Sequence, residues 1–152
     1  MAELHRPVFT SSVIYRDNRA ALAWLQRVFG FDIAWVLTDS KDNIVHAEMS
    51  LGDGIVMIGN EFAEWTKSPA SIGGMNTQRI HVKLESGIDE HYAHARAAGA
   101  KIVGEPQDQF YGDRTYAAED LDGHRWTFAQ TVRHVTNEEM EQATGFKFKD
   151  GL

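Results

Sequence analysis

The amino-acid sequence predicts an α+β fold built from two β-α-β-β-β units, and three observations lead to this prediction. The order strand, helix and three strands occurs twice along the 152 residues. Each predicted helix ends at a glycine followed by a strand, and a loose segment at 61–76 separates the two copies. Self-similarity of this kind is typical of duplicated structure. We expect one domain over 1–152, with units at about 8–60 and 77–131 and a C-terminal helix at about 137–145.

The first unit begins with a strand at 8–15, which is rich in β-branched and aromatic residues and has Phe9, Val13 and Tyr15 on one face. A helix follows, with Asn18 as its cap and Gly30 at its end. Its apolar residues recur at helical spacing. They are Ala21, Leu22, Leu25, Val28 and Phe29. Three strands are then expected at 32–38, 44–51 and 54–60, separated by the turn-rich stretches SKDN and GDG.

The second unit repeats this order. A strand at 77–84 precedes a helix from Ile88 that ends in glycine, and strands follow at 100–106, 114–120 and 124–130. His91 and His94 lie three apart on this helix, and we expect them on a solvated face. The tail predicts a short helix after Thr136 or Asn137, with acidic residues near its positive end.

Composition excludes several classes of function. The chain has no cysteine, so disulfides, thiolate nucleophiles and cysteine-ligated metals are not available. The net charge of -7 argues against nucleic acid or an anionic membrane surface as partner. The first residues lack the pattern of a signal peptide, and the apolar runs are too short to cross a bilayer. We therefore expect a cytoplasmic protein that contacts neither nucleic acid nor a membrane.

Side chains of a strand alternate between its two faces, so each predicted strand has an apolar and a polar face. We expect the helices to cover the apolar faces. The polar faces contain groups that bind anions, metals or protons, such as His46 and Glu48 on 44–51 and Arg79 and His81 on 77–84. The same alternation is ordinary for an antiparallel sheet with one face in water, so the pattern leaves both readings open.

Three stretches occur in a fixed order across the paired units. They are WLQRVFGFDIAW, IVHAEMSLGDGIVMIG and FYGDRTYAAEDLDGHRWTFAQ. In this order and spacing the chain resembles the vicinal-oxygen-chelate superfamily, which includes glyoxalase I, bleomycin-resistance proteins and extradiol dioxygenases. It is most similar to the small bacterial glyoxalase/bleomycin-resistance-like branch. The resemblance covers nearly the whole chain and implies that the eight strands form an open, curved cup.

The resemblance also implies where metal-dependent members hold their ion, with one ligand on each of four strands. The matching positions here are Thr10, Glu48, His81 and Thr127. Glu48 and His81 suit a divalent metal, but a threonine hydroxyl is a poor ligand. His46 lies on the same strand face as Glu48, so a metal site of His46, Glu48 and His81 is the alternative set. The expected cofactor is therefore none or a divalent metal ion.

The hairpin at 110–130 offers further candidates. Arg114 could neutralise an anionic ligand, or it could pair with Asp113, Asp120 or Asp122 and fix the hairpin. His124 follows the Asp122–Gly123 turn, so we expect it to make a structural hydrogen bond. The candidate ligand-binding residues are Thr10, Ser12, His46, Glu48, Arg79, His81, Arg114, Tyr116 and Thr127.

The first functional expectation is a protein that binds a small organic molecule in the cup without an obligatory metal. The alternative is a metal-dependent lyase or isomerase similar to lactoylglutathione lyase, or a dioxygenase, acting on a substrate with vicinal oxygens. In an enzyme, Glu48 could also act unligated as the catalytic general base. The threonines at two ligand positions argue against glyoxalase I chemistry in particular. The resemblance further implies a homodimer, which in some members exchanges units between chains.

Overall fold

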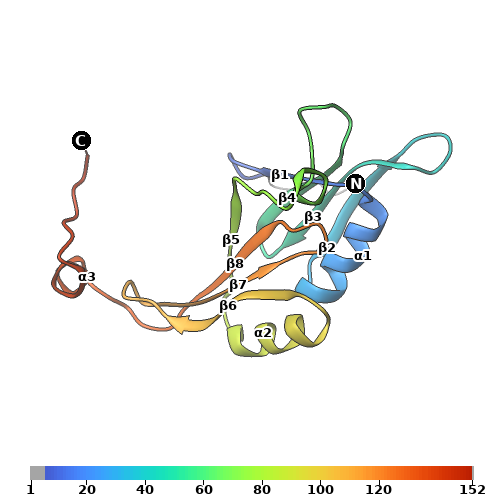
Figure 1. Ribbon diagram of the computed structural model, residues 1–152. Coiled ribbons are helices and arrows are strands. Elements are labelled where there is room, and N and C mark those ends of the chain that lie inside the picture. The colour runs from blue at the N-terminus through green and yellow to red at the C-terminus, as the bar shows by residue number, and fades with distance from the viewer. Residues whose placement is uncertain (1–5, 152) are drawn as a thin grey trace.

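The computed structural model describes residues 6–151 and confirms the predicted α+β class (Figure 1). These residues form two four-stranded sheets. The first sheet contains β1 (Ser11–Tyr15), β2 (Asp32–Thr38), β3 (Ile44–Leu51) and β4 (Gly54–Asn60). The second contains β5 (Arg79–Lys83), β6 (Lys101–Asp108), β7 (Asp113–Glu119) and β8 (Arg125–Thr131). The helices are α1 (Asn18–Phe29), α2 (Ile88–Ala97), α3 (Asn137–Thr144) and the short 3₁₀ helix η1 (Pro69–Ile72).

Both sheets have the same topology. Their strand orders are β1-β4-β3-β2 and β5-β8-β7-β6. In each, the first strand pairs in parallel with the fourth, and the other neighbours are antiparallel. The two sheets therefore repeat one pattern of order and direction, as the duplicated sequence pattern predicts.

The start of α1 corrects one detail of the prediction. Asp17 is the N-cap, and its carboxylate accepts a hydrogen bond from the backbone N–H of Ala20 at 3.0 Å. Asn18 is the first helical residue, and its Nδ2 points to the carbonyl oxygen of Ile44 at 3.5 Å. Gly30 ends the helix as predicted, with φ of 74° in the left-handed region.

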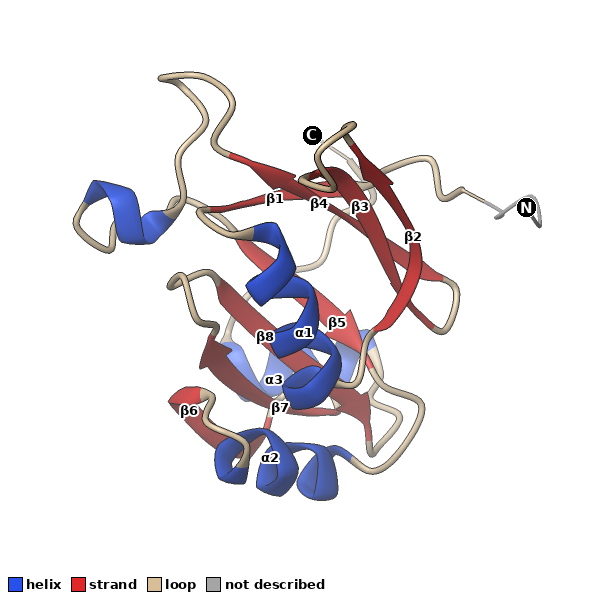
Figure 2. Ribbon diagram, turned by 90° about the vertical axis from the view of Figure 1, so that its right-hand side faces the viewer, coloured by secondary structure: helices blue, strands red, loops and turns tan. Residues whose placement is uncertain are grey.

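Helix α1 lies between the two sheets and joins their cores (Figures 1 and 2). Leu25 and Val28 are fully buried, and the ring of Phe29 reaches the second sheet. The centroid of Phe29 lies 4.8 Å from that of Phe128 and 5.8 Å from that of Trp126. The helix-facing sides of both sheets thus share one hydrophobic core, and their opposite faces carry the polar side chains.

The hairpin between β7 and β8 is fastened to the end of β1 by a buried carboxylate. One oxygen of Asp120 accepts from the hydroxyl of Tyr15 at 2.6 Å and from the indole N–H of Trp126 at 2.9 Å. The other accepts from the backbone N–H groups of Asp122 and His124, both at 3.0 Å. Every donor to this buried group comes from the hairpin or from the other unit, so the contact fixes one unit against the other.

Two further contacts strengthen the same junction. His124 Nε2 lies 2.7 Å from the carbonyl oxygen of Ile14, which confirms the structural hydrogen bond expected for this histidine. Arg16 donates from its backbone and from its guanidinium to the two oxygens of Asp122. Burial tends to raise the pKa of Asp122, but these donations from Arg16 hold it below its usual value.

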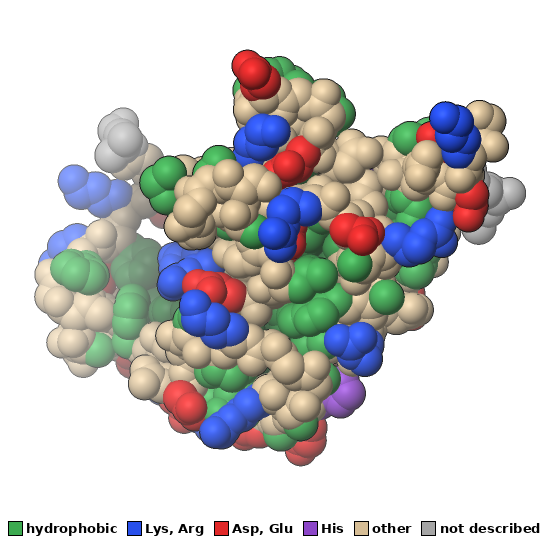
Figure 3. All heavy atoms as spheres, turned by 45° about the vertical axis from the view of Figure 1, so that its right-hand side comes forward, with side chains coloured by type: hydrophobic (Ala, Val, Ile, Leu, Met, Phe, Trp, Pro, Cys, Tyr) green, Lys and Arg blue, Asp and Glu red, His purple; other side chains and the backbone are tan. Residues whose placement is uncertain are grey.

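Residues 132–151, the C-terminal arm, leave the second sheet and carry α3 away from the body (Figures 1 and 3). The arm is rooted on the turn before β7, where the backbone N–H groups of Val132 and Arg133 donate to the carbonyl of Gly112. A Cβ on Gly112, whose φ is 96°, would lie 2.1 Å from the carbonyl oxygen of Arg133, so only glycine fits there. A capping box of Thr136 and Glu139 starts α3, which has no buried residue.

Two expectations about side chains are wrong. β1 begins at Ser11, and Phe9 is 91% exposed, so it does not share the core face of Val13 and Tyr15. His91 is not on a solvated face but packs between α2 and the core.

Among the helices of the described chain, none has the length and apolar character needed to span a bilayer.

The surroundings of His91 assign its tautomer. Its Nε2 lies 2.9 Å from the carbonyl oxygen of Phe29, which can only accept, so Nε2 carries the proton. Its Nδ1 then accepts from the hydroxyl of Tyr116 at 2.6 Å. Burial lowers the pKa of His91 and raises that of Tyr116, so both groups stay neutral in this contact.

Candidate functional site

The polar face of the second sheet carries a hollow of ≈ 330 Å³, called here the second-sheet hollow. Arg79 and His81 reach it from β5 and Thr127 from β8, where Thr127 is the register partner of His81. Tyr116 borders it from β7, although its ring packs on Phe128 in the core. The hollow therefore brings together four of the predicted ligand-binding residues on three adjacent strands.

Arg79 is the cation of this face that lacks an acidic partner among residues 6–151. Its neighbour Arg125 pairs with Glu119 at 3.0 Å, and Lys83 pairs with Asp113 at 3.1 Å, but Arg79 forms no ion pair in the described chain. Its guanidinium is therefore available to an acceptor-rich or anionic group of a ligand.

Polar side chains complete the second-sheet hollow opposite Arg79. Gln107, Gln109 and Tyr111 line it from the end of β6 and the turn that follows. Gln109 is oriented by its own hydrogen bond, because its Nε2 donates to the hydroxyl of Thr115 at 2.9 Å. The hollow thus offers several donors and acceptors on a rigid strand scaffold.

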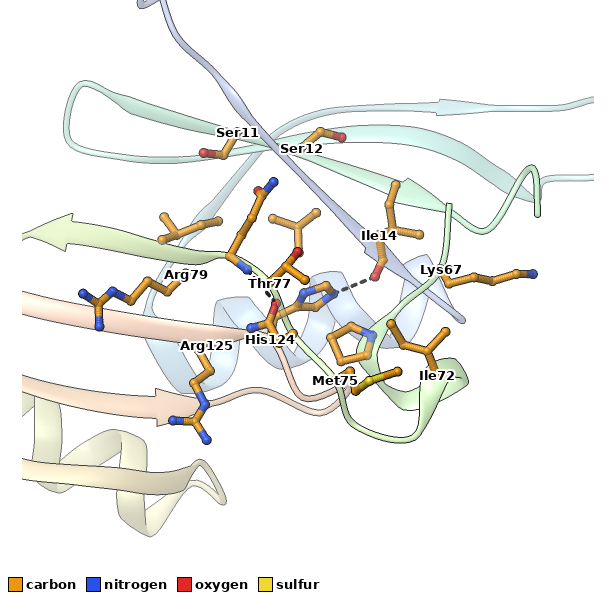
Figure 4. Close-up of a pocket in the computed structure, with 15 residues that line it drawn as sticks. Ser11, Ser12, Ile14, Lys67, Ile72, Met75, Thr77, Arg79, His124 and Arg125 are labelled. Carbon is orange, nitrogen blue, oxygen red and sulfur yellow. Dashed lines mark hydrogen bonds between the residues drawn. The ribbon is translucent and has the colours of Figure 1, made fainter. Parts of the chain in front are cut away.

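Two smaller cavities lie at the junction of the units. Ser12, another predicted ligand-binding residue, lines one of ≈ 180 Å³ together with Arg79 and His124 (Figure 4). The other, of ≈ 280 Å³, is lined by His81 and apolar core residues and is bordered by Phe9. Arg79 and His81 thus each border the second-sheet hollow and one junction cavity.

Glu48 lies on the polar face of the first sheet, yet only 1% of its surface is exposed. Its Oε1 accepts from Arg6 Nη1 at 2.6 Å, and its Oε2 accepts from Trp35 Nε1 at 3.0 Å. His46 Nε2 lies 3.9 Å from Oε1, and the His46 ring lies beside Trp35 with centroids 5.2 Å apart. We call Arg6, Trp35, His46 and Glu48 the Glu48 cluster.

The predicted metal ligands do not come together within one chain. His46 and Glu48 are neighbours, but His81 lies in the second-sheet hollow. The described residues contain no group of three histidine, aspartate or glutamate side chains placed to hold a metal ion. Both oxygens of Glu48 also accept hydrogen bonds already. Within a single chain, His46, Glu48 and His81 therefore do not fit a divalent metal ion.

Two other predicted residues lie away from the cavities described above. Thr10 precedes β1 and is half-buried. Arg114 donates from Nε to Asp89 and from Nη1 to Asp108, both at 2.9 Å. These partners lie on α2 and β6, so the expectation that Arg114 pairs with a carboxylate of its own hairpin is wrong. Arg114 instead ties α2 to the edge of the second sheet.

Sequence reasoning missed two members of the Glu48 cluster. The register of β2 and β3 places Trp35 opposite Glu48, and pairing these strands across the SKDN turn could have found it. Arg6 contacts a residue 42 positions away, and no local pattern signals that contact.

Comparison with known proteins agrees with this fold. Residues 8–128 match the pattern of the Glyoxalase/Bleomycin resistance protein/Dioxygenase superfamily. The crystal structure of TioX from Micromonospora sp. ML1 is 36% identical, with a TM-score of 0.67 over 81% of this chain and 97% of TioX. The fosfomycin resistance protein FosX from Listeria monocytogenes shares the fold at 18% identity, with a TM-score of 0.60 over 89% of this chain and 98% of FosX. An uncharacterized protein of Mycobacterium bovis is 25% identical over 141 residues, which are 90% of this chain and 91% of that relative. The chain therefore belongs to the glyoxalase/bleomycin resistance protein/dioxygenase superfamily.

Proposed function

We propose that this protein binds a small organic molecule in the second-sheet hollow and needs no metal ion to do so. The observation that carries the proposal is the grouping of Arg79, His81 and Thr127 around a concavity of ≈ 330 Å³. Ligand sites typically measure about 300–1,000 Å³ and combine a concave wall with a few fixed polar groups. The guanidinium of Arg79, which has no acidic partner within residues 6–151, favours a ligand with an anionic or acceptor-rich group.

A fragment screen followed by NMR tests this proposal. In ¹H–¹⁵N spectra, we expect bound fragments to shift the amide signals of residues 79–83, 104–111 and 127. Arg79→Ala should weaken binding of such a fragment by about tenfold, which corresponds to about 1.4 kcal/mol.

Arg125→Ala is the matched control. It removes the same charge from the neighbouring register position, but Arg125 does not line the second-sheet hollow. We expect affinity within about twofold of the wild type. Equal losses in the two variants would contradict binding in this hollow.

The contact between His46 and Glu48 favours a second candidate, a metal-dependent lyase, isomerase or dioxygenase. As metal ligands, His46 Nε2 and Glu48 Oε1 lie 3.9 Å apart on one strand face. The third ligand, His81, would have to come from a second copy of the chain. A bound ion would polarise vicinal oxygens of the substrate. Without an ion, Glu48 would act as a general base only after release from Arg6.

Elemental analysis of gently purified protein separates the two candidates. If no metal is needed, we expect the metal content to be well below one ion per two chains. The metal content of His81→Ala should then equal that of the wild type. Stoichiometric metal in the wild type that is lost in His81→Ala would instead support the enzyme, because imidazole is a preferred ligand of divalent transition metals.

We also propose that the protein acts as a cytoplasmic homodimer. The C-terminal arm supports this, because it presents Phe146 and Phe148 at 70% and 49% exposure and stands apart from the body (Figure 3). An isolated helix as short as α3 is marginal in water, so packing against a second copy would stabilise it.

A further inference from the structure

We propose that the Glu48 cluster is a recognition site for a guanidinium or amidinium group, and that Arg6 occupies this site in the free chain. The proposal concerns the polar face of the first sheet and is independent of the second-sheet hollow. It rests on three features of the cluster, namely its buried carboxylate, its aromatic walls and the weak anchoring of Arg6.

The carboxylate of Glu48 is buried and needs a cation. Burying an ionised carboxylate is unfavourable unless it is paired and hydrogen-bonded. Trp35 supplies a neutral donor to Oε2, but the full positive charge comes from Arg6 at 2.6 Å from Oε1. A site that holds the guanidinium of Arg6 at hydrogen-bonding distance has the charge and geometry to hold the guanidinium of a ligand in its place.

The surroundings of the carboxylate favour a flat, delocalised cation. Trp35 and His46 flank it with their rings tilted by 39° to each other. Planar cations are weakly hydrated and pack well against aromatic rings, whereas a compact metal ion would require further oxygen or nitrogen ligands. The cluster has the chemistry of a guanidinium pocket rather than of a metal centre.

Arg6 is held to the body by little else. It lies on segment 6–10, which precedes β1 and contains Val8 and Phe9 at 96% and 91% exposure. Within residues 6–151, this segment makes one hydrogen bond, the contact of Arg6 with Glu48. The Arg6 side chain is itself half exposed. Arg6 is therefore placed as an occupant that a ligand can displace.

Benzamidinium is a suitable probe, and neutral benzamide, of nearly the same shape, is its control. Binding is followed by NMR through the indole N–H signal of Trp35, assigned with a Trp35→Phe variant, because this group donates to Glu48. A ligand that competes with Arg6 can bind only while Arg6 is out of the site. Its apparent Kd is therefore the intrinsic Kd divided by the fraction of chains in which the site is free. We expect Arg6→Ala to bind benzamidinium at least about fivefold more tightly than the wild type.

Arg19→Ala is the matched variant, since it removes one exposed arginine that pairs elsewhere, with Asp42. It should bind benzamidinium as the wild type does, and Glu48→Gln should lose binding by at least about tenfold. Equal affinities of Arg6→Ala and Arg19→Ala would overturn the inference, as would equal binding of benzamide. If Glu48→Gln fails to fold, the comparison of the two arginine variants still decides. None of these outcomes bears on Arg79, so the proposed ligand site is tested separately.

Discussion

The carboxylate of Asp120 joins the two units through buried hydrogen bonds. It accepts from Tyr15 of the first unit and from Trp126 of the second, and its remaining lone pairs are filled by backbone N–H groups. Burial and the negative charge of Asp120 raise the pKa of Tyr15 well above its usual value, so the phenol remains a donor. The Asp-x-Asp-Gly-His-x-Trp stretch therefore has a structural role, and its Asp, His and Trp side chains do not line the second-sheet hollow.

Asp120→Asn is expected to lower the free energy of unfolding by about 2–4 kcal/mol, because an amide NH₂ would face donors that need an acceptor. Urea unfolding followed by circular dichroism measures the change. Asp108→Asn is the control, since that carboxylate is 69% exposed and pairs only at the surface with Arg114. It should cost no more than about 1 kcal/mol. Equal destabilisation of the two variants would show that the buried hydrogen bonds of Asp120 do not stabilise the junction between the units.

At the scale of elements, sequence periodicity predicts the sheets because each strand has one face in the core. Ala47 and Met49 of β3 and Trp126 and Phe128 of β8 are buried, as their alternation predicts. The same period of two places Thr127 on the opposite face of β8 from Trp126. Patterns of this kind report local geometry and burial, which are properties of one element at a time.

Periodicity does not predict the surroundings of a side chain when a distant element of the fold packs against it. His91 has the spacing of a surface residue, but α1 ends against it and its imidazole bonds to Phe29 and Tyr116. Arg6 lies on a segment without regular structure, and only the folded first sheet brings Glu48 within its reach. The candidate site was therefore predictable as a set of strand faces, whereas the pairing of those faces depends on the tertiary arrangement.

At the scale of the whole molecule, the described residues of one chain do not place the two polar faces around a common cavity. His81 and Thr127 line the second-sheet hollow, whereas His46 and Glu48 form a separate cluster with Arg6. Both faces remain available for contacts with a second copy. The exposed C-terminal arm offers apolar surface for such an assembly, and its root on Gly112 fixes the direction in which it leaves the body (Figure 1).

We expect sedimentation velocity to show a dimer and the double variant Phe146→Ser/Phe148→Ser to raise its dissociation constant by at least about tenfold. Burying one phenylalanine contributes about 1.5–3 kcal/mol, and tenfold corresponds to about 1.4 kcal/mol, so partial burial of both rings suffices. Leu37→Ser is the control, because Leu37 is similarly exposed at 54% but belongs to the β2–β3 hairpin at the opposite end of the molecule (Figure 1). A wild-type monomer, or equal weakening by Leu37→Ser, would show that the arm does not hold two copies together. If the double variant is monomeric and still binds fragments in the second-sheet hollow, the ligand site is complete within one chain.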